Sequence, residues 1–265
     1  MSDAGLAVGV FDSGVGGLTV LKQLMTRLPA VSTIYLGDTA RVPYGTKSSD
    51  TVIRYAIACA QLLMSRGIQL LVVACNTASA FALEHLQKTL GIPVIGVIEP
   101  GARAAVAATQ NHRIGIIGTA GTIRSEAYQR AILSLHSDTA IVSRPCPLFV
   151  PLAEEGWLEG EVPRTIAATY LQEFKDANVD TLVLGCTHYP LLKPVIRDVM
   201  GNDVALIDSA EAVSDAVEEA LAGHATGAGA PSHRFLVTDA PDSFRVISER
   251  FLGHGIDDVE WVDVA

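Results

Sequence analysis

The sequence is short of basic residues. It holds 19 lysines and arginines against 29 aspartates and glutamates in 265 residues, which gives a formal net charge of -10. Nucleic-acid-binding domains normally carry a basic patch, so this balance argues against a nucleic-acid partner. The overall field of an acidic chain also repels anions, so any anion site must be made locally by backbone amides and helix N-termini.

Long apolar runs and paired cysteines are missing as well. The apolar stretches are strand-sized, far short of the roughly 18 residues that suggest a spanning helix. The opening MSDAGLAVGVF lacks the basic region that precedes the apolar run of a signal peptide. We therefore expect a soluble, cytoplasmic protein with no membrane partner. The cysteines form no C-x-x-C pair and no zinc-type cluster, which predicts free thiols and no metal site; they are Cys59, Cys75, Cys146 and Cys186.

What the chain has is apolar material, 49% of its residues, in alternating strand-like and helix-like segments. Runs of Val, Ile and Leu that are apolar throughout favour parallel strands buried on both faces, and the rhythm of strand and helix predicts an α/β fold. The predicted strands are Leu6–Phe11, Thr33–Leu36, Leu70–Ala74, Arg113–Gly118, Ala140–Ser143, Thr181–Gly185 and Val204–Ile207. The predicted helices include Ser49–Arg66, Ala78–Leu90, Arg124–Leu135 and Pro163–Lys175.

A faint internal repeat divides the chain. LLVVACNTASA (Leu70–Ala80) resembles TLVLGCTHYPLL (Thr181–Leu192), and VGVFDSGVGGL resembles IGIIGTAGTI. We therefore predict two pseudosymmetric, doubly wound parallel-sheet units with the active site between them. The expected domains are 1–98 plus 210–265, and 99–209. The Gly/Ala-rich stretch Gly223–Ser232 is predicted to be a loop, after which the strand–helix–strand of His233–Ala265 returns to the first unit.

Cys75 and Cys186 occupy matching positions, each where a parallel strand ends and a helix is predicted to begin. Open α/β sheets bind ligands at that edge, and a helix N-terminus favours the thiolate. Two thiols flanking one ligand can remove a proton from one face of a carbon and return one to the other, without a cofactor. The competing interpretation, a small buried hydrophobic residue, fits Cys59 and Cys146 better.

Two loops near the first strands hold further candidates. FDSGVGGL offers Asp12 and Ser13 in an anion-binding turn, although both residues also suit a helix cap. Its glycine spacing is not that of a dinucleotide fingerprint, even though Asp38 imitates the ribose-binding acid. GDTARVPYG forms a predicted turn at which Tyr44 presents its hydroxyl near the same edge, next to Gly45.

Polar residues also follow both matched cysteines. Asn76 and Thr77 come after Cys75, while Thr187 and His188 come after Cys186. They are explained either as ordinary helix caps or as side chains that hold a carboxylate beside the thiols. His188 is in addition a candidate orienter or proton partner, as is Glu154, with Glu155 as its alternative.

Together these motifs resemble the glutamate racemase family, in the wider aspartate/glutamate racemase family. The resemblance rests on GVFDSGVGGLTVL, YLGDTARVPYG, VVACNTASA, IGIIGTAGTI, CPLFVPLAEEG and LVLGCTHYPLL, in that order along nearly the whole chain. It implies inversion of L- and D-glutamate without pyridoxal phosphate or metal, with Cys75 and Cys186 as bases. It further implies D-glutamate supply for peptidoglycan and a homodimer as a candidate assembly. By position, the substrate-holding residues would be Asp12, Ser13, Tyr44, Gly45, Asn76, Thr77, Thr187 and His188, and Asp12, Glu154 and His188 would assist proton transfer.

Three alternatives stay open at this point. One is a racemase of the same superfamily acting on aspartate or a hydantoin. Another is a hydrolase with a single nucleophilic thiol, which predicts one essential cysteine and a covalent adduct. The third is a non-catalytic ligand-binding protein built from two similar units.

Overall fold

The computed structural model describes residues 6–222 and 230–264. The chain divides into two compact units, Met1–Val97 with Ala210–Ala265, and Ile98–Ser209. Of the predicted loop Gly223–Ser232, residues 223–229 lie outside the described part, and residues 230–232 belong to no helix or strand. Each helix within the described residues is too short or too polar to cross a bilayer.

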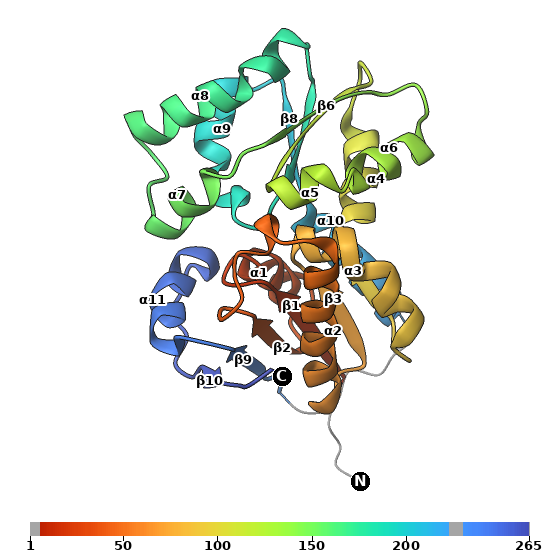
Figure 1. Ribbon diagram of the computed structural model, residues 1–265, viewed down its shortest axis with the longest axis vertical. Coiled ribbons are helices and arrows are strands. Elements are labelled where there is room, and N and C mark those ends of the chain that lie inside the picture. Colours follow the sequence, from red (N-terminus) through yellow and green to blue (C-terminus); the bar gives the residue numbers. More distant parts are fainter. Residues whose placement is uncertain (1–5, 223–229, 265) are drawn as a thin grey trace. The chain divides into compact units, whose positions relative to one another are not determined.

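The first unit is built on a six-stranded, wholly parallel sheet with the order β10-β9-β2-β1-β3-β4 (Figure 1). Its strands are β1 (Ala7–Asp12), β2 (Ser32–Gly37), β3 (Leu70–Val73), β4 (Val94–Gly96), β9 (His233–Val237) and β10 (Glu260–Trp261). Because β9 pairs with β2, the last segment of the chain completes this sheet. The strand–helix–strand predicted after the loop is thereby confirmed.

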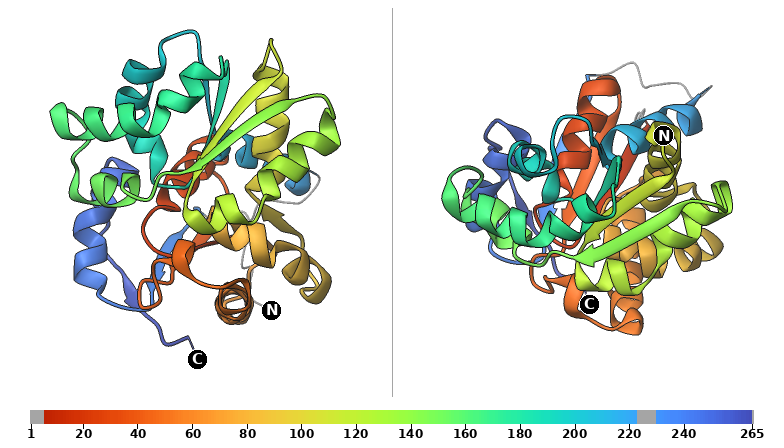
Figure 2. Two further views of the ribbon diagram at one scale, coloured as in Figure 1. Left: turned by 45° about the horizontal axis from the view of Figure 1, so that its top comes forward. Right: turned by 90° about the horizontal axis from the view of Figure 1, so that it is seen from above.

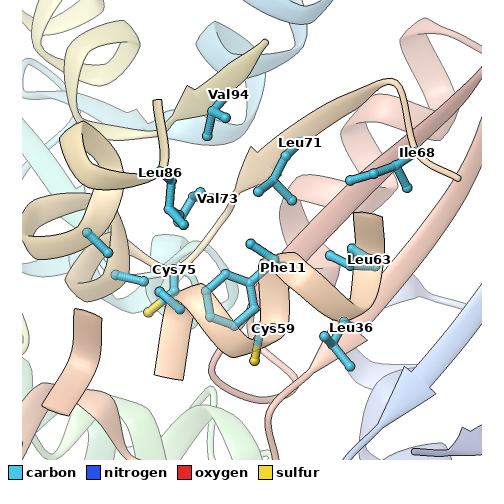
Figure 3. Packing of buried hydrophobic residues seen from close by; sticks show 14 of the residues in the cluster. Phe11, Leu36, Cys59, Leu63, Ile68, Leu71, Val73, Cys75, Leu86 and Val94 are labelled. Atoms are coloured by element: carbon cyan, nitrogen blue, oxygen red, sulfur yellow. The ribbon is translucent and has the colours of Figure 1, made fainter. Parts of the chain in front are cut away.

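Helices of the first unit pack in pairs, α2 against α3 and α1 against α11. The helical segments are α1 (Leu18–Arg27), η1 (Tyr44–Thr46), α2 (Ser49–Ser65), α3 (Asn76–Thr89), α10 (Ser209–Leu221) and α11 (Pro241–Leu252). Alternate residues of a strand point to the same face, so Phe11, Leu71 and Val73 join the apolar sides of α2 and α3 in one buried cluster (Figure 3).

The second unit has a four-stranded parallel sheet with the order β6-β5-β7-β8. Its strands are β5 (Arg113–Gly118), β6 (Ala140–Pro145), β7 (Thr181–Gly185) and β8 (Ala205–Asp208). Figure 2 shows β5 and β6 as neighbouring arrows in the yellow-to-green part of the chain. Its helical segments are α4 (Ile98–Ala108), α5 (Ala120–Arg124), α6 (Ala127–Leu135), α7 (Phe149–Glu155), α8 (Glu161–Asp176), η2 (Tyr189–Leu192) and α9 (Lys193–Met200).

The α/β class and the parallel sheets are confirmed, but three local expectations are wrong. The strand β4 was not expected. The predicted helix Arg124–Leu135 begins only at Ala127, as α6, because Glu126 before it adopts a left-handed backbone with φ of 54°; Arg124 is the last residue of the separate helix α5. No α-helix begins directly after Cys186. A 3-10 turn with Pro190 intervenes, and α9 starts only at Lys193.

Candidate functional site

The carboxyl edge of the first sheet brings Ser13 and Cys75 together. The parallel pairing of β1 with β3 puts Phe11 opposite Val73, so the residues that follow each strand emerge at the same edge. The Cys75 thiol donates to the Ser13 hydroxyl over 3.6 Å. Both residues are nearly buried, with 6% and 9% of their surfaces exposed.

The turn after β1 is held by its own side chains. The Gly14 amide donates to Asp12 Oδ2 at 3.0 Å, and the Tyr35 hydroxyl donates to the Gly14 carbonyl at 2.7 Å. Gly17 is required by close approach, because a Cβ there would lie 2.4 Å from Cβ of Asp12. Gly17 is also the N-cap residue of α1, so the interpretation of Asp12 and Ser13 as caps of that helix is wrong.

Cys75 itself is the N-cap residue of α3, with φ of -63° and ψ of 119°. Asn76 and Thr77 are the first two residues of the helix, and each is only 2% exposed. The capping interpretation therefore fails for them too. The positive end of the α3 dipole lies at Cys75, where it stabilises negative charge on the sulfur. A thiol expected at a helix N-terminus is thus found there.

Tyr44 does not present its hydroxyl as expected. The side chain is 1% exposed, and its hydroxyl donates to Asp38 Oδ2. Burial, followed by the nearby Cys59 and Asp38, raises the pKa of Tyr44, so the phenol keeps the proton that it donates. Gly45 is buried beside it. The phenol is therefore turned away from a ligand, and any contact that Tyr44 or Gly45 makes with one falls to the backbone.

In the second unit, the His188 imidazole lies between the Cys186 thiol and the Glu154 carboxylate. His188 Nδ1 lies 3.7 Å from Cys186 Sγ, and His188 Nε2 lies 2.8 Å from Glu154 Oε1. Cys186 and His188 are 6% and 5% exposed, whereas the Glu154 side chain is 34% exposed. Helix α7 supplies Glu154 and positions it on the imidazole, while Glu155 is exposed. Of the two glutamates considered from the sequence, Glu154 makes the contact.

The imidazole of His188 favours its charged form. Burial alone lowers the pKa of His188, but the hydrogen bonds to Cys186 and Glu154 outweigh burial and raise this pKa from 6.5 to about 10. A protonated imidazole donates from both ring nitrogens, which suits a sulfur on one side and a carboxylate on the other. The arrangement therefore stabilises negative charge on Cys186. Thr187, between the two residues, is 6% exposed.

Cys59 and Cys146 differ from the matched pair in exposure. All four cysteines belong to the apolar cluster of their own unit, but Cys59 and Cys146 are 0% exposed, whereas Cys75 and Cys186 are each 6% exposed. Cys59 lies within α2 and accepts from Arg41 Nη2 over 3.6 Å, and Cys146 directly follows β6. Burial raises the pKa of Cys59 and of Cys146, so both remain neutral thiols at ordinary pH. Among the described residues, no group of three or more His, Cys, Asp or Glu side chains is arranged to hold a metal ion.

One arrangement at the first sheet edge was missed. The sequence presents Asp38 only as an imitation of a ribose-binding acid, whereas in the structure its carboxylate is a fully buried centre of hydrogen bonds. Thr238, which donates to Asp38 Oδ1 at 2.9 Å, is 200 positions away in the chain. No local pattern connects such residues. The only available signal was the position of Asp38 at the end of a predicted strand.

Known proteins resemble the chain over almost its full length. The family model for Asp/Glu/Hydantoin racemase matches residues 16–220. The glutamate racemase of Geobacter metallireducens is 56% identical over 261 residues, which are 97% of each chain. Among solved structures, a glutamate racemase isoform of Bacillus anthracis aligns with a TM-score of 0.93 at 40% identity over 98% of each chain. The Francisella tularensis glutamate racemase in complex with D-glutamate aligns with a TM-score of 0.92 at 39% identity over 99% of each chain. The chain therefore belongs to the Asp/Glu/Hydantoin racemase family and, within it, to the glutamate racemases, which are amino-acid racemases.

Proposed function

We propose that the chain inverts glutamate with two thiols, Cys75 and Cys186, as its acid/base groups, and with neither pyridoxal phosphate nor a metal. One observation supports this most strongly. Each thiol follows a strand at the carboxyl edge of its own parallel sheet, is 6% exposed, and lies within contact of a polar side chain. Cys59 and Cys146, by contrast, are 0% exposed, and burial raises the pKa of each thiol.

The reaction begins with one cysteine as thiolate and the other as thiol. The thiolate removes the α-proton: the Cα–H bond breaks, an S–H bond forms, and the electron pair passes into the α-carboxylate. The thiol then protonates Cα from the opposite face, and the two sulfurs have exchanged protonation states. Both sulfurs must therefore reach one Cα from opposite sides, which is a requirement of the proposal.

The two thiols have unlike partners. Ser13 accepts from Cys75, whereas Cys186 faces the imidazole that Glu154 supports. In the proposed mechanism His188 and Glu154 stabilise the Cys186 thiolate, and Asp12 assists at Cys75. Once it has taken up the electron pair from Cα, the α-carboxylate carries two negative charges and needs preorganised donors around it. We assign these to Ser13, Asn76, Thr77 and Thr187 and to the backbone of Tyr44 and Gly45.

The proposed cellular role follows from the product. D-glutamate is a building block of bacterial peptidoglycan, so we propose that the chain supplies it for the cell wall, acting in the cytoplasm. Expression in a bacterium that requires added D-glutamate should restore growth without it, and failure to do so would contradict the role. Assembly as a homodimer stays a prediction, to be checked by light scattering.

Racemisation of L-glutamate in deuterated water, without added cofactor, tests the mechanism. Deuterium should appear at Cα of the product. Cys75→Ser and Cys186→Ser should each lower kcat/KM by about a hundredfold or more, because each removes one acid/base group. Cys146→Ala is the matched control, since it also removes a buried thiol of the second unit, and it should remain active.

The outcomes separate the competing mechanisms. A strict need for pyridoxal phosphate, or full activity of either serine variant, would defeat the two-thiol mechanism. A covalent adduct on one cysteine would favour the thiol hydrolase. Activity on aspartate and none on glutamate would mean that the chain is an aspartate racemase of the same superfamily.

A further inference from the structure

Asp38 lies at the carboxyl end of β2, beside the strand that ends in Asp12, and its carboxylate is completely buried. Three side chains donate to it. Arg41 Nε lies 3.0 Å from Oδ1 and 2.8 Å from Oδ2, the Tyr44 hydroxyl bonds to Oδ2, and the Thr238 hydroxyl lies 2.9 Å from Oδ1. A buried carboxylate needs such donors, because an unsatisfied one would be costly.

The donors come from separate segments. Tyr44 opens the 3-10 turn η1, Arg41 belongs to the loop before it, and Thr238 follows β9. Arg41 also lies over the Tyr55 ring of α2, with its guanidinium carbon 4.5 Å from the ring centre. The carboxylate of Asp38 thereby holds the loop and η1 at the sheet edge, while Arg41 connects the loop to α2.

The orientation of Tyr44 connects the hydrogen bonds of Asp38 with the proposed substrate site. Its ring packs between Phe11 and Tyr55, with centroid distances of 6.2 and 5.7 Å, and its hydroxyl is held by Asp38. The phenol is thus turned into the protein. What Tyr44 and Gly45 offer to a ligand is backbone, whose position depends on where the phenol is anchored.

We propose that Asp38 is the positioning residue for glutamate binding by η1: its buried carboxylate holds Tyr44 and Arg41, and so fixes the backbone of Tyr44 and Gly45 against the substrate. This inference rests on the proposed role of those two residues in holding glutamate. It assigns to Asp38 no contact with the substrate. Loss of the carboxylate should weaken binding of glutamate more than it slows turnover of bound glutamate.

Two variants test the inference. Asp38→Asn replaces the carboxylate with an amide, whose NH2 group cannot accept from the side chains that donate to Asp38. Tyr44→Phe keeps the ring but removes the hydroxyl that donates to Asp38 Oδ2. Thr33→Val is the matched control. It removes a side-chain hydrogen bond between β2 and β9, from Thr33 to His233 Nδ1 at 2.9 Å, near the opposite end of the same strand pair. All three variants lose a hydrogen bond of β2 or of its following turn, and only two touch the Asp38 carboxylate.

Kinetics and amide hydrogen exchange of residues 40–48 give independent readouts. For Asp38→Asn we expect KM to rise about tenfold with a smaller fall in kcat, the size of one lost charged hydrogen bond. Exchange should quicken in this segment, including at the Lys47 amide that donates to the Tyr44 carbonyl. Tyr44→Phe should change both readouts in the same direction by about threefold. Thr33→Val should leave both within about twofold of the wild type, even where it lowers the melting temperature comparably.

Unchanged exchange of residues 40–48 in both Asp38→Asn and Tyr44→Phe would overturn the inference, as would a KM increase in Thr33→Val equal to theirs. If Asp38→Asn does not fold, Tyr44→Phe decides alone. A wild-type protein that does not racemise glutamate would defeat the proposed function, and the exchange experiment would still decide whether Asp38 holds the turn. The two failures are therefore distinguishable.

Discussion

At the scale of single residues, the site depends on what each polar side chain contacts rather than on its identity alone. Cys75 contacts a neutral hydroxyl, whereas Cys186 contacts an imidazole bonded to a carboxylate. Positive charge lies near both sulfurs, but it comes from the N-terminus of α3 at Cys75 and from the protonated imidazole at Cys186. The two bases of the proposed mechanism are therefore chemically unequal before substrate arrives.

The charge of His188 can be followed directly. We expect its ring resonances, in protein labelled at histidine, to titrate near pH 10 rather than near the ordinary 6.5. Glu154→Gln should lower this midpoint, because it replaces the carboxylate that helps to raise the pKa. A wild-type midpoint at or below 6.5 would show that burial outweighs both hydrogen bonds.

The same shift sets a pH dependence of stability. The folded-state pKa of His188 lies above its unfolded value of 6.5, so the protonated imidazole stabilises the fold. This stabilisation is fully present below pH 6.5 and is lost as the pH rises through about 10. Thermal melting from pH 6 to 10 should show a decline that is shallower in His188→Gln. Equal slopes of melting temperature against pH in the two proteins would contradict a stabilising role of the protonated His188.

Gly17 offers a steric prediction in the turn after β1. Gly17→Ala would place a Cβ 2.4 Å from Cβ of Asp12, so the backbone or Asp12 must shift. We expect a loss of about 1–3 kcal/mol in the free energy of unfolding, as in other overpacked sites, together with a fall in kcat/KM. For stability the control is Gly14→Ala, whose Cβ would meet only Val42 at 3.5 Å. Equal urea midpoints for both variants would refute the steric argument.

At the scale of elements, sequence patterns predicted strands correctly where a segment is almost uniformly buried. The Val/Ile/Leu runs of β5 and β7 predicted both strands to the residue, because an interior parallel strand is apolar on both faces. The three-residue β4 is too short to leave such a run. The break at Glu126 is a backbone conformation with no residue signal of its own.

Contacts within the site were less predictable than its elements. The matched cysteines and the histidine two residues beyond Cys186 could be found because strand ends are visible in the sequence. The bond from Glu154 to His188 spans 34 positions and depends on how α7 packs. The orientation of Tyr44 depends on the buried carboxylate of Asp38 and could not be inferred from the turn residues alone.

The core under α2 allows a test at the same scale. Leu63 is fully buried in the cluster that joins α2 and α3 to the sheet. Leu63→Ala should cost about 2–5 kcal/mol of unfolding free energy, the usual range for a buried leucine. Gln61→Ala, at an exposed position of the same helix, should stay within about 0.5 kcal/mol. Urea unfolding followed by circular dichroism measures both, and similar midpoints would place Leu63 outside the core.

At the scale of the whole molecule, the chain and its proposed substrate have charges of the same sign. The chain has a formal charge of -10, and glutamate at neutral pH has a net charge of -1. Its long-range field therefore opposes encounter, and local donors such as the α3 N-terminus must supply the attraction at short range. Salt shortens the reach of the field from roughly 30 Å at 0.01 M to about 8 Å at 0.15 M, while contacts inside a nearly buried site are screened much less.

An increase in ionic strength should consequently raise the racemisation rate at low glutamate concentrations. We expect kcat/KM for glutamate to increase about twofold between 0.01 and 0.15 M salt, because screening removes the long-range repulsion and leaves short-range binding intact. The kcat at saturating glutamate serves as the control and should stay constant, since the bound substrate no longer experiences the encounter barrier. Repeating the series with sodium and potassium chloride separates screening from ion-specific binding. A fall in kcat/KM with salt would mean that a local positive field outweighs the net charge of the chain even at long range.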